Sequence, residues 1–183
     1  MGSIAAVADL RALEVLYLDS NLFTGTIESI RELTSLVELG LYSNFFTGSL
    51  DPVRNLLNLT RLDLHESQLT GNLNAVGNLD RLEILDLSDN NLDGGLTVLG
   101  SLGKLGSLKL SSNSFVGGLE SLQSLVEITE LNLSNNQLQG GIDPLRGLHR
   151  MIKLSLDNNQ LHGDIASLSN MTRMHRLEAC CNE

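Results

Sequence analysis

Cysteine and long apolar runs are both scarce in this sequence of 183 residues. The only two cysteines, Cys180 and Cys181, are adjacent. A vicinal disulfide is strained and a disulfide framework needs spaced pairs, so these cysteines do not indicate a compartment. No run approaches the roughly 18 apolar residues of a membrane span. Met1 to Leu10 lack the basic start and the apolar core of a signal peptide. We therefore expect no membrane insertion and no signal peptide in this chain.

Positive charge is scarce as well. Twelve lysine and arginine residues stand against 22 aspartate and glutamate residues, which gives a formal net charge of −10. Proteins that bind nucleic acid or anionic membranes present a basic footprint. The composition therefore predicts no nucleic-acid partner. We also expect no cofactor and no bound metal.

Asparagine, in contrast, recurs with a fixed spacing of 23 residues. The column, which contains one serine, is Asn21, Asn44, Ser67, Asn90, Asn113, Asn136, Asn159 and Asn182. A fixed period between 20 and 50 residues is typical of a solenoid, in which each unit packs only against its neighbours. A buried amide both donates and accepts hydrogen bonds, so each asparagine is expected to bridge backbone groups of its own turn and of the next turn.

Apolar residues and glycine keep the same register around each asparagine. Leu10, Leu13, Leu16 and Leu18 precede Asn21 at offsets that recur in the later units, and Gly25 begins a glycine column four residues after the asparagine. The alternating x-L-x-L-x segment has the period of a strand with one buried face. The glycine column is expected to supply a tight bend or a close approach of backbones between stacked turns.

The unit LxxLxxLxLxxNxLxGxLxxL resembles that of leucine-rich-repeat proteins. It is most similar to the plant-type class, which is found in receptor-like kinase ectodomains and polygalacturonase-inhibiting proteins. The resemblance implies an α/β solenoid: a right-handed superhelix with a concave parallel β-sheet and a convex side of short turns and 3-10 helices. We expect residues 1–183 to form a single array of about eight units. The resemblance also favours an extracellular or cell-surface location.

The sequence departs from the plant-type pattern in three respects. Its unit has 23 rather than 24 residues; Glu28, Asp51 and Asn74 stand where a proline is expected; and neither end carries a cysteine-bearing cap. Solenoids normally need polar caps over their terminal repeats. We therefore expect either a piece of a longer array or ends that are covered in an end-to-end or larger complex.

Function is expected on the concave side, because the regular columns are used for packing. Tyr17 and Tyr42 lie at positions that project from the predicted sheet, and Phe45 with Leu22 lies near the strand ends. Aromatic residues ringed by polar groups are typical anchors of interfaces. The predicted partner-binding residues are Tyr17, Asp19, Glu38, Tyr42, Phe45, Arg61, Asp63, His65 and Asp86. The alternative interpretation is an ordinary surface of drifting repeats.

Chemistry on this face is the weaker interpretation. Asp63, His65 and Ser88 are expected side by side and superficially resemble an acid, base and nucleophile. An open sheet provides no evident oxyanion donor and no pocket, so we predict no catalytic residues and no enzyme. Asp63 and Asp86 could hold a cation, but Arg61 and Lys109 are expected to neutralise them. His175 with the two cysteines has no recognised zinc spacing.

The sequence therefore predicts a non-enzymatic recognition module that binds a protein or peptide partner. One alternative is a structural subunit packed into a larger complex. A minor alternative, an ice-binding or polysaccharide-related role, comes from a short array of small polar residues: Thr24, Thr26, Thr47, Ser49, Thr70 and Asn72. The array ends at Asp93 and Val116, which leaves a small surface.

Overall fold

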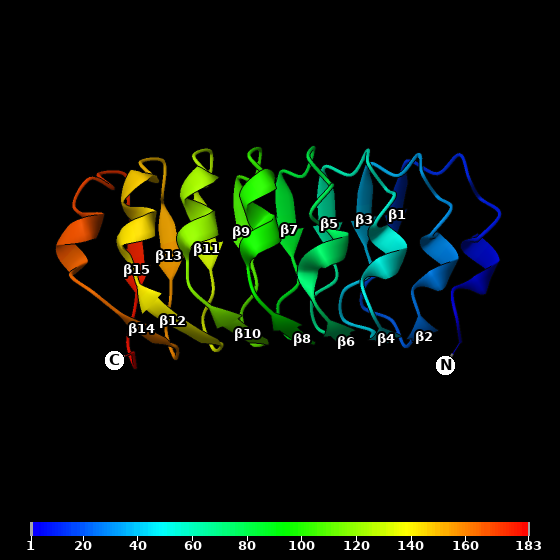
Figure 1. The fold of residues 1–183 in the computed structure, drawn as a ribbon. Helices are drawn as coiled ribbons and strands as arrows, with labels where there is room; N and C mark the ends of the chain where they lie inside the picture. The colour runs from blue at the N-terminus through cyan, green and yellow to red at the C-terminus, as the bar shows by residue number, and fades with distance from the viewer. Residues whose placement is uncertain (1, 183) are drawn as a thin grey trace.

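Each unit of the sequence forms one turn of a solenoid in the computed structural model, which describes residues 2–182 (Figure 1). Eight parallel strands, one from each turn, build the concave sheet in chain order. They are β1 Val15–Tyr17, β3 Glu38–Gly40, β5 Arg61–Asp63, β7 Ile84–Asp86, β9 Ser107–Lys109, β11 Glu130–Asn132, β13 Lys153–Ser155 and β15 Arg176–Glu178. Neighbouring strands pair residues that are 23 positions apart, such as Leu16 with Leu39. The structure confirms the predicted leucine-rich-repeat solenoid with a parallel sheet.

A second parallel sheet, of seven strands, was not predicted. It runs along the lower edge of the solenoid in Figure 1 and consists of β2 Thr24–Thr26, β4 Phe45–Gly48, β6 Gln68–Gly71, β8 Asn91–Gly94, β10 Ser114–Gly117, β12 Gln137–Gly141 and β14 Gln160–His162. Six of these strands contain a glycine with positive φ, and Gly163 follows β14 directly. A glycine weakens the interior of a regular strand. The stacking of identical turns nevertheless brings their backbones into register.

Short 3-10 helices return the chain from the second sheet to the next strand of the concave sheet, and they cover the convex side (Figure 1). They are η1 Ala5–Val7, η2 Glu28–Ile30, η3 Asp51–Val53, η4 Leu73–Ala75, η5 Thr97–Ser101, η6 Glu120–Ser124, η7 Asp143–Gly147 and η8 Ile165–Leu168. Pro52 and Pro144 lie in the first turn of η3 and η7, where the missing N–H costs no hydrogen bond. Within residues 2–182 no helix is long and apolar enough to cross a bilayer.

The asparagine column forms a ladder of hydrogen bonds between turns. Asn44 accepts a hydrogen bond from the backbone N–H of Phe23 at 3.0 Å and donates to the carbonyl oxygen of Leu18 at 2.9 Å, both in the preceding turn. It also donates to Leu41 and Tyr42 in its own turn. The amide therefore bridges its own turn and the preceding one, not the next one.

Two columns of left-handed backbone bend each turn. The predicted bend is present at the glycines, whose φ is 87° at Gly25 and 84° at Gly71. A second column was not predicted: the residue before each asparagine also has positive φ, between 51° and 59°. Its members are Ser20, Ser43, Glu66, Asp89, Ser112, Asn135, Asn158 and Cys181. Asparagine and aspartate tolerate this conformation better than most residues, but serine and glutamate gave little signal for it.

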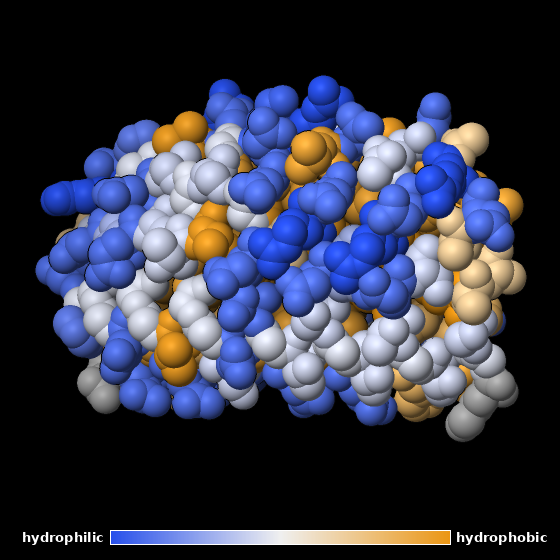
Figure 2. Space-filling view, turned by 45° about the vertical axis from the view of Figure 1, so that its right-hand side comes forward, coloured by the Kyte–Doolittle hydropathy of each residue, from blue (hydrophilic) through white to orange (hydrophobic). Residues whose placement is uncertain are grey.

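The core is one continuous column of aliphatic side chains with two fully buried rings, Phe46 and Phe115. Interior leucines such as Leu39 and Leu62 are completely buried, and each stabilises the fold by about 1.5–3 kcal/mol. Some positions of the apolar columns, all in the first and last turns, are not buried: Leu10, Ile165, Leu177 and Ala179 are exposed. Leu10 is 51% exposed and Leu177 is 40% exposed, because each lies in a turn that has a neighbour on one side only. Across the convex side the hydrophobic residues form separate spots in a mainly hydrophilic surface (Figure 2).

Candidate partner-binding surface

The concave sheet places eight of the nine predicted partner-binding residues on one side of the first four turns. Tyr17, Glu38, Arg61, Asp63 and Asp86 occupy outward positions of β1, β3, β5 and β7. The other three follow these strands by two residues, and they are Asp19, Tyr42 and His65. Phe45 differs, since it lies in β4 of the second sheet. The sequence period placed Phe45 next to the strand end but did not reveal that the chain had already turned into another sheet.

Tyr17 lies flat across β3 because Gly40, directly opposite, has no side chain. A Cβ atom at Gly40 would lie only 2.4 Å from Cδ1 and 2.7 Å from Cε1 of the tyrosine ring. The ring therefore rests on the backbone of its neighbour, and its hydroxyl donates a hydrogen bond to the carboxylate of Glu38. This hydrogen bond, together with partial burial, raises the pKa of Tyr17. Even so, 45% of Tyr17 remains accessible to a partner.

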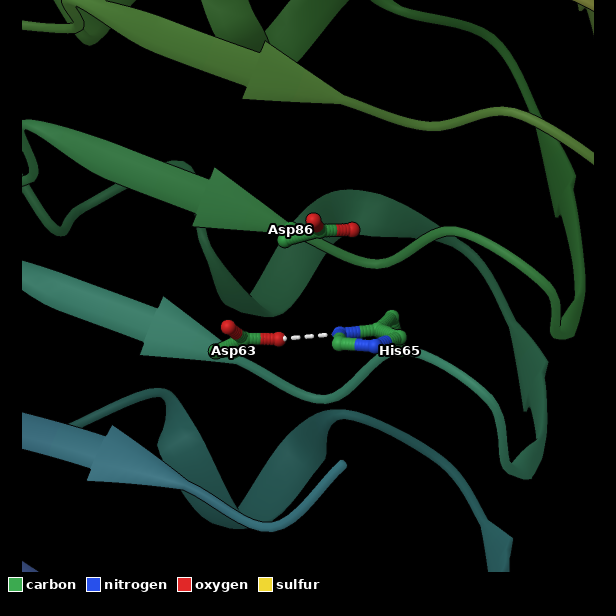
Figure 3. Close-up of side chains that lie close together, drawn as sticks. All are labelled: Asp63, His65 and Asp86. Carbon is green, nitrogen blue, oxygen red and sulfur yellow. Dashed lines mark hydrogen bonds and ion pairs between the residues drawn. The ribbon is translucent and has the colours of Figure 1, made fainter. Parts of the chain in front are cut away.

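Tyr42 is held by stacking. Its ring lies 4.4 Å from the ring of His65, with 10° between the two planes. Asp19, a hydrogen-bond acceptor for the hydroxyl group, raises the pKa of Tyr42. His65 is fixed in turn, because its Nδ1 lies 2.6 Å from Oδ1 of Asp63 (Figure 3). The rings of Tyr42 and His65 are thus held in fixed orientations, which would reduce the entropy lost if they took part in binding.

Asp63 is the buried centre of this group, with 4% of the residue exposed. Its second oxygen accepts a hydrogen bond from Nη2 of Arg61 at 2.9 Å. A buried carboxylate needs such partners, since its desolvation is otherwise costly. The pairing also uses the positive charge of Arg61, the only lysine or arginine on the outer positions of β1, β3, β5 and β7. Arg61 Nε is buried without a hydrogen-bond partner among the described residues.

One cluster on this surface has the composition of a metal site. Single ligand atoms of Asp63, His65 and Asp86 all lie within 4.8 Å of one another (Figure 3). The nitrogen that faces Asp63 is engaged in the hydrogen bond, Arg61 occupies the other oxygen of Asp63, and Nζ of Lys109 lies 3.8 Å from Oδ2 of Asp86. Both carboxylates and one histidine nitrogen are therefore already engaged by protein groups. The geometry is that of a neutralised polar network.

The arrangement of Asp63, His65 and Ser88 does not form a chain of hydrogen bonds. Among the described residues, His65 is bonded to Asp63 and not to the Ser88 hydroxyl. Ser88 is itself buried, and its backbone N–H donates to Asp86 at 3.1 Å. A nucleophile activated by a histidine needs the second hydrogen bond as well. His175 and the cysteines are not part of any ligand cluster among residues 2–182; the two sulfur atoms lie 2.9 Å apart in free cysteines.

The last four turns present a different surface. Lys153 donates to Glu130 at 3.0 Å, Lys109 lies 3.8 Å from the same carboxylate, and Arg176 donates to Glu178 at 2.6 Å. Partial burial acts to raise the pKa of Glu130, but the hydrogen bond from Lys153 and the nearby lysine charges hold it below the ordinary value. The hydrogen bond from Arg176 lowers the pKa of Glu178 in the same way. The charges here neutralise one another.

Sequence reasoning missed three contributors to the surface of the first four turns. Gly40 makes room for the Tyr17 ring, and Glu66 and Asp89 occupy the left-handed column beside His65 and Ser88. Ser43 donates a hydrogen bond to Glu66 at 2.5 Å. A glycine inside a strand pattern is a signal for close approach and could have identified Gly40.

The array of small polar residues lies on the second sheet. Thr47 and Thr70 each donate a weak hydrogen bond of 3.4 Å to a glycine carbonyl of the preceding turn. Thr26, Ser49 and Asn72 are exposed beside them. The threonine hydroxyls thus serve the stacking of turns, and the array stays as short as the sequence predicted.

Comparison with family models identifies leucine-rich repeats in two parts of the chain. A model described as Leucine Rich repeats (2 copies) matches residues 126–170, and one described as Leucine Rich Repeat matches residues 81–105. No curated protein matches the sequence. The matched segments contain the columns of leucine and asparagine described above.

Solved structures share the fold over almost the whole chain. The LRR ectodomain of the plant membrane receptor kinase GASSHO1/SCHENGEN3 from Arabidopsis thaliana, in complex with CASPARIAN STRIP INTEGRITY FACTOR 2, is 33% identical with a TM-score of 0.85; the match covers 99% of this chain and 26% of that one. The Arabidopsis receptor kinase HAESA, in complex with the peptide hormone IDA and the co-receptor SERK1, is 30% identical with a TM-score of 0.92. This match covers 100% of this chain and 32% of that one.

A bacterial protein is similar too. An internalin (inlF) from Listeria monocytogenes is 28% identical with a TM-score of 0.82, and the match covers 95% of this chain and 49% of the internalin. The chain therefore spans about a quarter to a third of the length of the plant ectodomains and about half of this internalin.

Proposed function

Because the chain is a leucine-rich-repeat protein, we propose that it is a non-enzymatic recognition module that binds a protein or peptide partner on the concave side of its first four turns. The observation that carries this proposal is the pair of preoriented tyrosines. Tyr17 rests on Gly40, and Tyr42 is stacked on His65, so that both rings stay partly exposed within a polar surround. Exposed, rigid aromatic groups with polar neighbours are the usual anchors of protein interfaces.

The structural neighbours support a peptide or protein as the partner. HAESA is described in complex with a peptide hormone and a co-receptor, and RGFR1 is described as a plant peptide hormone receptor in complex with RGF2. An open sheet of parallel strands suits such partners, because it offers one row of side chains for each turn. A small molecule would need a deeper cavity that buries most of its surface.

Selection of peptides on the intact chain tests the proposal. Random peptides of about twelve residues, long enough to cross several strands, would be displayed on phage and selected for binding. Bound peptides should slow amide hydrogen exchange in residues 15–20, 38–43 and 61–66. They should leave residues 130–135 and 153–158 unchanged, which provides the control within the same molecule. Protection confined to the second sheet or to the convex side would refute the proposal and favour a structural role.

A further inference from the structure

The concave side carries an uneven distribution of charge. We name as the acidic half the outward residues of β1, β3, β5 and β7 together with the two residues that lie two and three positions after each strand. These positions are 19–20, 42–43, 65–66 and 88–89. It contains six carboxylates and one arginine: Asp19, Glu38, Arg61, Asp63, Glu66, Asp86 and Asp89. The corresponding residues of β9, β11, β13 and β15, the balanced half, contain three of each sign: Lys109, Glu130, Lys153, Asp157, Arg176 and Glu178.

The excess charge of the acidic half is not neutralised within the molecule. Asp63 is paired with Arg61, and Asp86 lies 3.8 Å from Lys109 across the boundary between the halves. Among residues 2–182, no lysine or arginine forms an ion pair with Asp19, Glu38, Glu66 or Asp89. Glu38, Glu66 and Asp19 instead accept hydrogen bonds from hydroxyl groups, which carry no charge.

These unpaired carboxylates flank the two aromatic anchors. Glu38 accepts a hydrogen bond from the Tyr17 hydroxyl, and Asp19 accepts one from the Tyr42 hydroxyl. Glu66 and Asp89 continue the row at the C-terminal ends of β5 and β7. Negatively charged carboxylates on adjacent strands repel each other, and a positively charged group bound between them relieves that repulsion. Positive groups beside an aromatic ring also gain from the charge distribution of the ring.

From this complementarity we infer that the partner of the acidic half is a basic peptide segment, with lysine or arginine side chains next to an apolar or aromatic residue. The inference rests on the proposed function and names the chemistry of its partner. The cationic groups would lie along the row of Asp19, Glu66 and Asp89, and the apolar residue would lie against Tyr17 and Tyr42. Electrostatic complementarity of this kind sets specificity and association rate.

The peptides selected on the intact chain provide the test. Lysine and arginine should be about twofold more frequent in the binders than in the unselected library, and binding should weaken about tenfold between low and high salt because exposed charges are screened. A variant with Asp19→Asn, Glu66→Asn and Asp89→Asn should weaken binding about tenfold. Asparagine suits the left-handed positions, since Asn135 and Asn158 already occupy equivalent ones.

A matched control removes the same charge elsewhere. Glu32→Gln, Asp80→Asn and Asp93→Asn alter three exposed residues outside the acidic half, so binding should change less than twofold if the effect is local. Thermal unfolding checks that both variants fold. If the triple variant of the acidic half does not fold, the single change Asp89→Asn replaces it, with an expected loss of about twofold to threefold.

The outcomes separate this inference from the proposed function. Peptides that protect residues 15–20 and 38–43 but carry no excess of basic residues would overturn the inference and leave the proposed function intact. Basic peptides that weaken equally in both variants would show attraction to the net charge of the chain, and they would overturn the inference as well. Peptides that bind without protecting the acidic half would refute both.

Discussion

The acidic half and the balanced half are built from the same backbone unit, yet their ionisable groups behave in opposite ways. In the balanced half, hydrogen bonds and charges of lysine and arginine lower the pKa values of Glu130 and Glu178. In the acidic half, carboxylates act on uncharged phenols and raise the pKa values of Tyr17 and Tyr42. One half satisfies its charges internally, whereas the other leaves carboxylates free for a partner. A solenoid can thus differentiate its surface without altering its core.

The largest expected effect removes the aromatic difference between the halves. Tyr17→Ala with Tyr42→Ala should weaken binding of a selected peptide by about 2–4 kcal/mol, which is about 30-fold to 1000-fold in Kd. Both rings lie on the outer face of the sheet and outside the leucine core, so the fold should persist. Calorimetric titration measures the loss, and Asn132→Ala with Ser155→Ala in the balanced half provides the control. Equal losses in the two variants would show that the aromatic groups are not the anchors.

The second prediction compares a buried charge with an exposed one. Asp63→Asn weakens the pairs with Arg61 and His65 and should lower the free energy of unfolding by about 1–3 kcal/mol, a value reduced because Arg61 is partly exposed. Glu130→Gln in the balanced half should cost about 0–1 kcal/mol, since its pairs are more exposed. Urea unfolding of both variants measures the difference. Comparable costs would show that burial of Asp63 contributes nothing.

The third prediction concerns Ser67, the one position of the asparagine column that is not asparagine, which lies in one of the four turns that carry the acidic half. Ser67 Oγ is buried without a hydrogen-bond partner among the described residues. Ser67→Asn should restore the amide bonds made at the other positions and raise stability by about 1 kcal/mol, seen as a higher Tm. Asn136→Ser in the balanced half should lower stability by a similar amount, because it removes four such bonds. An unchanged or lower Tm for Ser67→Asn would show a turn rebuilt around serine.

The smallest effect is in proton binding. A raised pKa means that the folded protein favours the neutral phenol, so the contribution of the Tyr17 hydrogen bond is present below the ordinary pKa of about 10 and is lost as the pH rises through the folded value. Glu38→Gln removes the negative acceptor and should move the pKa of Tyr17 back toward that value. Ultraviolet titration of phenolate in a Tyr42→Phe background isolates Tyr17. A titration unaffected by the substitution would contradict the observed contact.

The sequence predicted much of this architecture because its period is strict. The leucine columns, the parallel pairing and the positions of Tyr17 and Tyr42 all follow from counting in steps of 23. Three features did not follow. The second sheet depends on the stacking of turns rather than on strand propensity. The asparagine amides bond to the preceding turn, which the position of the amide in the sequence does not reveal. The position of the Tyr17 ring depends on the missing side chain of Gly40, which is 23 residues away in the sequence.

The repeated amide bonds have a consequence for how such a protein can change in length. Asn90, Asn113 and Asn159 make the same four contacts at the same offsets, so the joints between these turns are chemically interchangeable. Excising or duplicating one whole 23-residue unit within the balanced half would recreate a joint that already exists. The proposed binding surface and the number of turns that support it are therefore separable traits, which can vary independently when repeats are gained or lost.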